Sequence, residues 1–109
     1  MNKDYLEVEP ARDAVDAMKG PVLLEFGAPW CEHCRAADRF IEAALAAHLK
    51  VAHVRVEDGR GKPLGRSFKV KLWPTLVFLR DGRETGRLVR PADGEVFERA
   101  MRDIDPDQA

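Results

Sequence analysis

The chain has 109 residues, of which 45% are hydrophobic and 34% are charged, and its formal net charge at pH 7 is -1. This length predicts a single domain over residues 1–109, with enough chain to bury a core. Because the charge is near neutral and Lys and Arg are spread along the sequence, we expect neither nucleic acid nor an acidic membrane surface as a partner.

The sequence contains no targeting or membrane-spanning pattern. There is no run of about 20 apolar residues, and the acidic, mixed residues 1–10 lack the apolar centre of a signal peptide. We therefore expect a cytoplasmic protein, or a periplasmic one if a signal peptide has been removed.

In the first half of the chain, predicted helices alternate with predicted strands. Apolar residues at helical spacing predict a helix over residues 8–19. The apolar run 22–26 predicts a buried strand, and residues 31–50 have the apolar face of a long helix. The alternating, β-branched residues 51–56 predict a second strand.

The second half is predicted to hold a short helix within residues 60–70, a hairpin with strands at 75–79 and 84–89, and a helix over 94–104. The hairpin turn is Asp81-Gly82. The last helix is expected to turn five side chains inward: Val96, Phe97, Ala100, Met101 and Ile104. The polar residues 105–109 are expected to fray.

This order of elements predicts an α/β fold. Two strands joined by a helix should lie parallel with a right-handed crossover, and the hairpin adds an antiparallel pair. We expect a central mixed β-sheet of four to five strands flanked by helices on both faces.

The only two cysteines, Cys31 and Cys34, form a CxxC motif at the start of the first long helix. A thiolate in the first turn is stabilised by free backbone N–H groups and the helix dipole, and a cysteine three residues later lies on the same face. One thiolate can therefore attack a substrate disulfide and the other can resolve the mixed disulfide. The motif predicts thiol–disulfide exchange, with Cys31 as nucleophile and Cys34 as resolving thiol.

Two other interpretations of the motif remain open. The cysteines could be small buried side chains, or Cys31, His33 and Cys34 could belong to a metal site. Structural zinc sites usually have four ligands, and the sequence has no second cysteine pair. We expect no metal and no cofactor other than the redox-active Cys31–Cys34 disulfide.

The residues between the cysteines are expected to tune the redox potential. A protonated His33 near Cys31 would stabilise the thiolate and make the disulfide more oxidising, whereas Glu32 would act in the opposite sense. His33 could also be an exposed residue without influence.

Three stretches of the chain resemble the thioredoxin family. These are Phe-Gly-Ala-Pro-Trp-Cys-Glu-His-Cys at residues 26–34, Phe-Lys-Val with Trp-Pro-Thr between residues 68 and 75, and Phe-Leu-Arg-Asp-Gly at residues 78–82. The similarity extends from about residue 8 to about residue 105. It implies the thioredoxin fold and a protein-disulfide oxidoreductase active in cell redox homeostasis and electron transport. Its partners would be protein disulfides and a reducing or oxidising protein of unknown identity; we also expect a monomer.

The resemblance assigns a role to Glu25, a carboxylate inside an apolar strand where charge is costly. The family carries an aspartate there, which is thought to help move the proton of the resolving thiol. His53 aligns where a lysine pairs with that carboxylate. The alternative for Glu25 is an edge residue pointing to solvent.

The resemblance also places substrate-binding residues around the dithiol. Pro74 should be cis and lie opposite Cys31, with Trp73 and Thr75 beside it, where the backbone would bind an extended substrate. Trp30 would shield the dithiol on one side.

Four departures from the family pattern bear on the choice of substrate. Glu-His replaces the Gly-Pro found between the cysteines of general reductants, and Gly27 stands where an aromatic residue is frequent. Trp73 replaces a smaller residue, either lining the groove or packing as core, and Arg90 replaces a glycine that lets substrate approach. Trp73 and Arg90 together imply a reductase with a narrower clientele than a general thioredoxin. The alternatives are an isomerase-like or oxidant-like potential set by His33, and a non-enzymatic binding module with a redox-switched or metal-binding dithiol.

Overall fold

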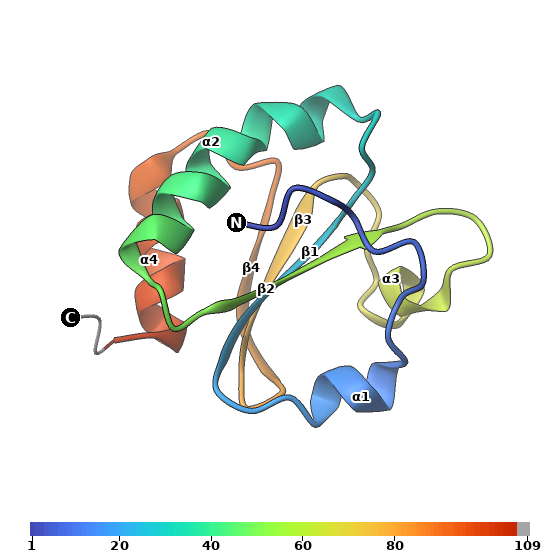
Figure 1. The fold of residues 1–109 in the computed structure, drawn as a ribbon, viewed down its shortest axis with the longest axis horizontal. Coiled ribbons are helices and arrows are strands. Elements are labelled where there is room, and N and C mark those ends of the chain that lie inside the picture. Colours follow the sequence, from blue (N-terminus) through green and yellow to red (C-terminus); the bar gives the residue numbers. More distant parts are fainter. Residues whose placement is uncertain (107–109) are drawn as a thin grey trace.

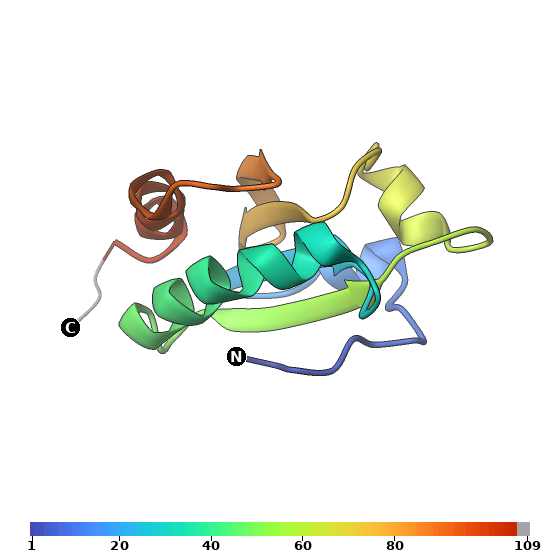
Figure 2. The same ribbon diagram turned by 90° about the horizontal axis from the view of Figure 1, so that it is seen from above.

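The computed structural model describes residues 1–106, which form a four-stranded mixed sheet with helices on both faces (Figures 1 and 2). The strands are β1 (Pro21–Gly27), β2 (Ala52–Glu57), β3 (Thr75–Arg80) and β4 (Arg83–Val89). Their order is β2-β1-β3-β4, with β1 parallel to β2 and the other pairs antiparallel. The predicted mixed sheet is confirmed.

Two helices cover each face of this sheet. The pair α2 (Glu32–Ala47) and α4 (Gly94–Ile104) lies on one side, and the short helices α1 (Arg12–Asp16) and α3 (Pro63–Ser67) lie on the other (Figure 1). Side chains of a strand alternate between faces, so Leu23 packs with the α2/α4 core and Leu24 with the α1/α3 core. Glu25 therefore shares the α2 face with Leu23. None of the helices within residues 1–106 is long and apolar enough to cross a membrane.

The predicted helix over residues 8–19 is wrong in its first part. Helix α1 begins only at Arg12, and Val8 is 88% exposed. Pro10 disfavours helical geometry in the residue before it. Leu6 instead forms a parallel bridge with Val56, with its N–H donating to the carbonyl of Arg55 at 2.8 Å. The segment before α1 therefore runs extended beside β2.

The predicted hairpin turn is confirmed. Asp81 and Gly82 have φ angles of 51° and 78°, the pair of positive values that a type I′ turn requires. A Cβ atom at Gly82 would lie 1.9 Å from the backbone oxygen of Asp16. Glycine is therefore needed both for the turn and for the close approach of the hairpin to α1.

Two expectations for the C-terminal region need correction. Val96 is 38% exposed rather than inward-facing. Asp105, expected to belong to a frayed tail, is buried because its carboxylate Oδ2 lies 3.0 Å from Nδ1 of His48. Residues 107–109 of that expected tail lie outside the described residues.

His48 joins the ends of α2 and α4. It is fully buried, and its Nε2 lies 2.7 Å from Oε2 of Glu98 while its Nδ1 contacts Asp105. Burial by itself lowers the pKa of His48, but the hydrogen bonds and negative charges of Glu98 and Asp105 outweigh it and raise the pKa above its ordinary value. The protonated ring is thus stabilised by the fold.

This arrangement predicts a pH-dependent stability. Since the folded-state pKa exceeds the unfolded value of about 6.5, the contribution of His48 is complete below that pH and is lost as the pH rises through the folded-state pKa. Urea unfolding from about pH 6 to about pH 9 should show a steeper loss of unfolding free energy for the wild type than for His48→Gln. Parallel curves for the two proteins would contradict the prediction.

Candidate active site

The two thiols lie at the N-terminal end of α2. Cys31 is the N-cap residue, and its Sγ accepts a hydrogen bond from the backbone N–H of Cys34 at 3.3 Å. Cys31 is 8% exposed and Cys34 is completely buried. The structure thus places a reachable thiol at the helix end and a second thiol one turn inside.

The buried thiol is a poor acid. Burial, followed by the hydrogen bond with Cys31, raises the pKa of Cys34 to about 12, while the Ala28 backbone and the Tyr5 hydroxyl act in the opposite direction. A thiol of this kind stays protonated at neutral pH. It can act as a nucleophile only once a base has removed its proton.

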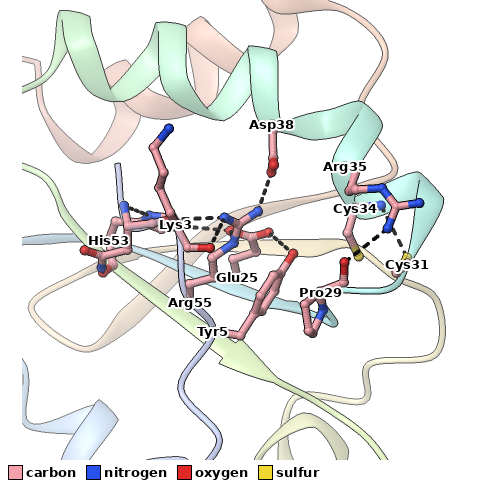
Figure 3. Close-up of polar contacts among 11 residues, drawn as sticks. Lys3, Tyr5, Glu25, Pro29, Cys31, Cys34, Arg35, Asp38, His53 and Arg55 are labelled. Atoms are coloured by element: carbon pink, nitrogen blue, oxygen red, sulfur yellow. Dashed lines mark hydrogen bonds and ion pairs between the residues drawn. The ribbon is translucent and has the colours of Figure 1, made fainter.

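Glu25 is completely buried, which rules out the alternative of an edge residue pointing to solvent. Its Oε1 lies 2.8 Å from Nε2 of His53 and 3.0 Å from Nε of Arg55, and its Oε2 accepts a hydrogen bond from the Tyr5 hydroxyl at 3.3 Å (Figure 3). The structure therefore brings together the Glu25–His53 pair that the family resemblance suggested, and adds two partners. The catalytic role of Glu25 stays a prediction.

Arg55 is a site residue that the sequence analysis missed. Its side chain is 3% exposed and forms ion pairs with Glu25 and with Asp38 of α2. The Arg55–Glu25 contact is an ion pair by distance, because the Nε–H does not have hydrogen-bond geometry. Strand alternation could have revealed it: residues 53 and 55 share a face of β2, and Arg55 is in register with Glu25.

A groove of about 430 Å³ opens beside Cys31. Its walls include Trp30 and Trp73, whose rings form a T-shaped contact with a distance of 5.5 Å between the ring centroids. The indole N–H of Trp73 donates to Asp58 at 2.9 Å. Trp73 thus lines the groove and also packs against the buried cluster of Ala28, Cys31 and Cys34. Its part in substrate binding stays a prediction. The groove is also lined by Glu32 and His33, the two residues expected to tune the redox potential, and by Lys71, Leu72 and Arg90; all five are exposed.

Not every predicted substrate-binding residue lies in this groove. The Trp73–Pro74 peptide bond is cis, as expected. Thr75, however, is 1% exposed, and its hydroxyl donates to the carbonyl of Leu72 at 2.6 Å. Pro74 is buried too. The Thr75 side chain is therefore turned inward and holds the loop that carries Trp73, and a substrate contact through the Thr75 backbone stays a prediction.

Arg90 is an exposed residue that lines the groove. Its backbone has a φ of 50°, in the region that favours glycine. Its N–H donates to the carbonyl of Pro74 at 3.0 Å, and its side-chain Nε donates to the carbonyl of Trp73 at 2.8 Å. The guanidinium group therefore already donates a hydrogen bond to the Trp73 carbonyl oxygen, which was expected to bind an extended substrate.

The dithiol is not part of a larger set of metal-binding side chains in the part of the chain that the structure describes. No group of three or more His, Cys, Asp or Glu residues there is arranged to hold a metal ion.

Comparison with known proteins gives matches to a family model, to a solved structure and to a plant protein. Residues 5–103 match the family model described as Thioredoxin. The solved structure of thioredoxin 2 from Pseudomonas aeruginosa PAO1 in its reduced form is 48% identical, with a TM-score of 0.87 over 98% of this chain and 99% of that chain. Thioredoxin H5 from Arabidopsis thaliana is 30% identical over 98 residues, which are 86% of this chain and 79% of that protein.

A second group of relatives is much longer. Protein disulfide-isomerase A2 from Pongo abelii is 46% identical over 68 residues, which are 59% of this chain. The chain covers only 13% of that isomerase. The match therefore concerns one segment of the isomerase.

Proposed function

Because this chain belongs to the thioredoxin family of thiol–disulfide oxidoreductases and has its fold, we propose that it reduces disulfides of other proteins and accepts a narrower range of them than a general thioredoxin does. In the reaction, the Cys31 thiolate attacks a substrate disulfide and releases one substrate thiol. Cys34 then attacks Sγ of Cys31, which releases the second thiol and leaves the Cys31–Cys34 disulfide. That disulfide is the redox carrier, and a separate protein must reduce it again.

The position of Arg90 carries the proposal of a narrow clientele. A substrate segment that pairs with the backbone beside Pro74 must share or displace the hydrogen bond between Arg90 and the carbonyl of Trp73. A bound segment that covers the guanidinium group keeps water away from it, so displacement then leaves the charge without a partner and costs free energy. Segments that add their own acceptor for the guanidinium group avoid this cost, whereas others bind less well.

Replacing Arg90 with glycine should therefore broaden the range of substrates. We expect kcat/KM for insulin disulfides to rise about tenfold, which corresponds to about 1.4 kcal/mol. The rate with a small disulfide such as hydroxyethyl disulfide should stay the same, because it does not reach the Trp73 backbone. Lys71→Ala, at another groove position, serves as the matched control. An unchanged or lower rate with insulin in Arg90→Gly would overturn the proposed clientele.

The second candidate is an isomerase or oxidant. It is favoured by the match to protein disulfide-isomerase A2 and by His33, which is exposed in the groove beside Cys31. Equilibrium titration against glutathione separates the candidates. A reduction potential near about -270 mV supports the reductase, whereas a value above about -200 mV supports the isomerase or oxidant.

A binding module with a redox-switched dithiol is the remaining alternative. Such a protein would bind a partner in one redox state without turning over many disulfides per molecule. Multiple turnovers of insulin in the presence of excess dithiothreitol would rule it out. A cytoplasmic location, where thiols are kept reduced, fits the reductase and is part of the same proposal.

A further inference from the structure

The N-terminal segment runs along β2, an edge strand of the sheet, and brings Tyr5 to the active site. Residues 2–6 lie along β2 (Figure 2). The Arg55 guanidinium donates to the carbonyls of Asn2 at 3.0 Å and Lys3 at 3.3 Å. Leu6 accepts from the Glu57 N–H at 3.0 Å. These contacts fix the position of Tyr5, and the Arg55 guanidinium also lies 4.2 Å from the centre of its ring.

The Tyr5 ring lies beside Gly27, which has no side chain. A Cβ atom at Gly27 would lie 3.4 Å from Cε2 and from the hydroxyl of Tyr5, and only 2.6 Å from Sγ of Cys34. Position 27 therefore has no room for a side chain, and the aromatic group at this point of the site comes from the N-terminal segment. The same distances place the Tyr5 hydroxyl and the Cys34 thiol around one backbone position.

The Tyr5 hydroxyl contacts the buried carboxylate and lies on the same side of Gly27 as the resolving thiol. It donates to Oε2 of Glu25 at 3.3 Å (Figure 3), and it acts against the effect of burial on Cys34. Burial, followed by the negative charge of Glu25, raises the pKa of Tyr5 itself far above its ordinary value. Tyr5 therefore keeps its proton, so it can pass a proton on only by receiving another one at the same time.

We propose that the Tyr5 hydroxyl carries the proton of Cys34 to Glu25 when the mixed disulfide is resolved. This step rests on the proposed thiol–disulfide exchange. The Cys34 proton moves to the Tyr5 oxygen while the Tyr5 proton moves to Oε2 of Glu25. The Cys34 sulfur then bonds to Sγ of Cys31, the bond from Sγ to the substrate sulfur breaks, and the substrate leaves as a thiolate. The two cysteines lose two electrons, the substrate disulfide gains them, and the leaving thiolate takes up a proton from solvent.

The charged and titratable groups that face the relay come from the N-terminal segment, β1, β2 and α2. They are Tyr5, Glu25, His53, Arg55, Cys31 and Asp38. His53 and Arg55 contact Oε1 of Glu25, which leaves Oε2 to the Tyr5 hydroxyl. The relay is ready for another turnover once Glu25 has released the transferred proton to solvent.

The test is a single-turnover reaction with one equivalent of 5,5′-dithiobis(2-nitrobenzoate). Attack by Cys31 releases the first coloured thiolate, and resolution by Cys34 releases the second, so the two steps are recorded separately. Tyr5→Phe keeps the ring and removes only the hydroxyl. We expect an unchanged first phase and a second phase slowed about 10–100-fold at pH 7. The slowed phase should accelerate with rising pH more steeply than in the wild type, because hydroxide must then remove the Cys34 proton.

Controls separate the relay from a structural role. Val8→Ala, on the same segment but 88% exposed, should match the wild type in both phases. In the wild type itself, the second phase should slow in D₂O more than the first phase does. An unchanged second phase in Tyr5→Phe, or equal slowing of both phases, would overturn the relay while leaving thiol–disulfide exchange intact. Failure of the wild type to release either thiolate would instead overturn the proposed function.

Discussion

Replacing Cys31 with serine should lower the rate of insulin-disulfide reduction by at least about 1,000-fold, because a hydroxyl at this position is not ionised and cannot replace a thiolate nucleophile. Cys31 is the thiol at the end of α2 that borders the groove. Cys34 is completely buried and cannot reach a protein disulfide in its place. The measurement is the initial rate of insulin reduction with dithiothreitol as electron source.

Cys34→Ser provides the matched variant for this experiment. It keeps the attacking thiol, so it should form a mixed disulfide with substrate and then stop, and the adduct should be visible by non-reducing electrophoresis. Full insulin reductase activity in Cys31→Ser would show that the nucleophile has been assigned to the wrong cysteine. Unfolding curves that match the wild type would confirm that neither substitution acts through stability.

Replacing Arg55 with methionine should lower the free energy of unfolding by about 3–5 kcal/mol, because it removes one partner of a buried ion pair and leaves the other charge behind. Glu25 is completely buried and would keep only His53 and the Tyr5 hydroxyl as partners. The N-terminal segment would also lose its hydrogen bonds from the guanidinium group. Urea unfolding followed by circular dichroism gives the free energy.

Two further variants make this prediction specific. Asp16→Ala breaks the exposed pair with Arg12 and should cost less than about 1 kcal/mol. The double variant Arg55→Met/Glu25→Leu should be more stable than Arg55→Met, because no charge is left unpaired in the interior. If Arg55→Met loses no more stability than Asp16→Ala, the buried pair does not stabilise the fold.

The features that the sequence predicted well depend on near neighbours in the chain. The dithiol at the start of α2 follows from spacing alone, and the Asp81-Gly82 turn from the backbone freedom of its residues. The bounds of α4 agree with the predicted 94–104 because Asp93 caps the first turn, accepting from the N–H of Glu95 at 2.8 Å. In each case the decisive interaction spans only a few residues.

The features that the sequence did not reveal depend on distant partners. Tyr5 and Glu25 are 20 residues apart, and Arg55 and Asp38 are 17 apart. The apolar spacing of Val8, Ala11, Val15 and Met18 predicted a helix, and this hid the extended segment that carries Tyr5. Gly27 was noted as a departure, but its reason, the lack of room beside Cys34, appears only when the N-terminal segment is in place.

The path of the N-terminal segment also determines when the site becomes complete during synthesis. Residues 2–6 leave the ribosome before β2 does, yet the hydrogen bonds that hold them lie on β2, as in the contact between Asn2 and His53, which are 51 residues apart. Such long-range contacts form only after the intervening chain has been made and its loop has been closed. A nascent chain therefore carries both cysteines before β2 is complete and Tyr5 can dock beside them. The two thiols exist for a time without the Tyr5 hydroxyl and acquire it only when residues 2–6 pair with β2.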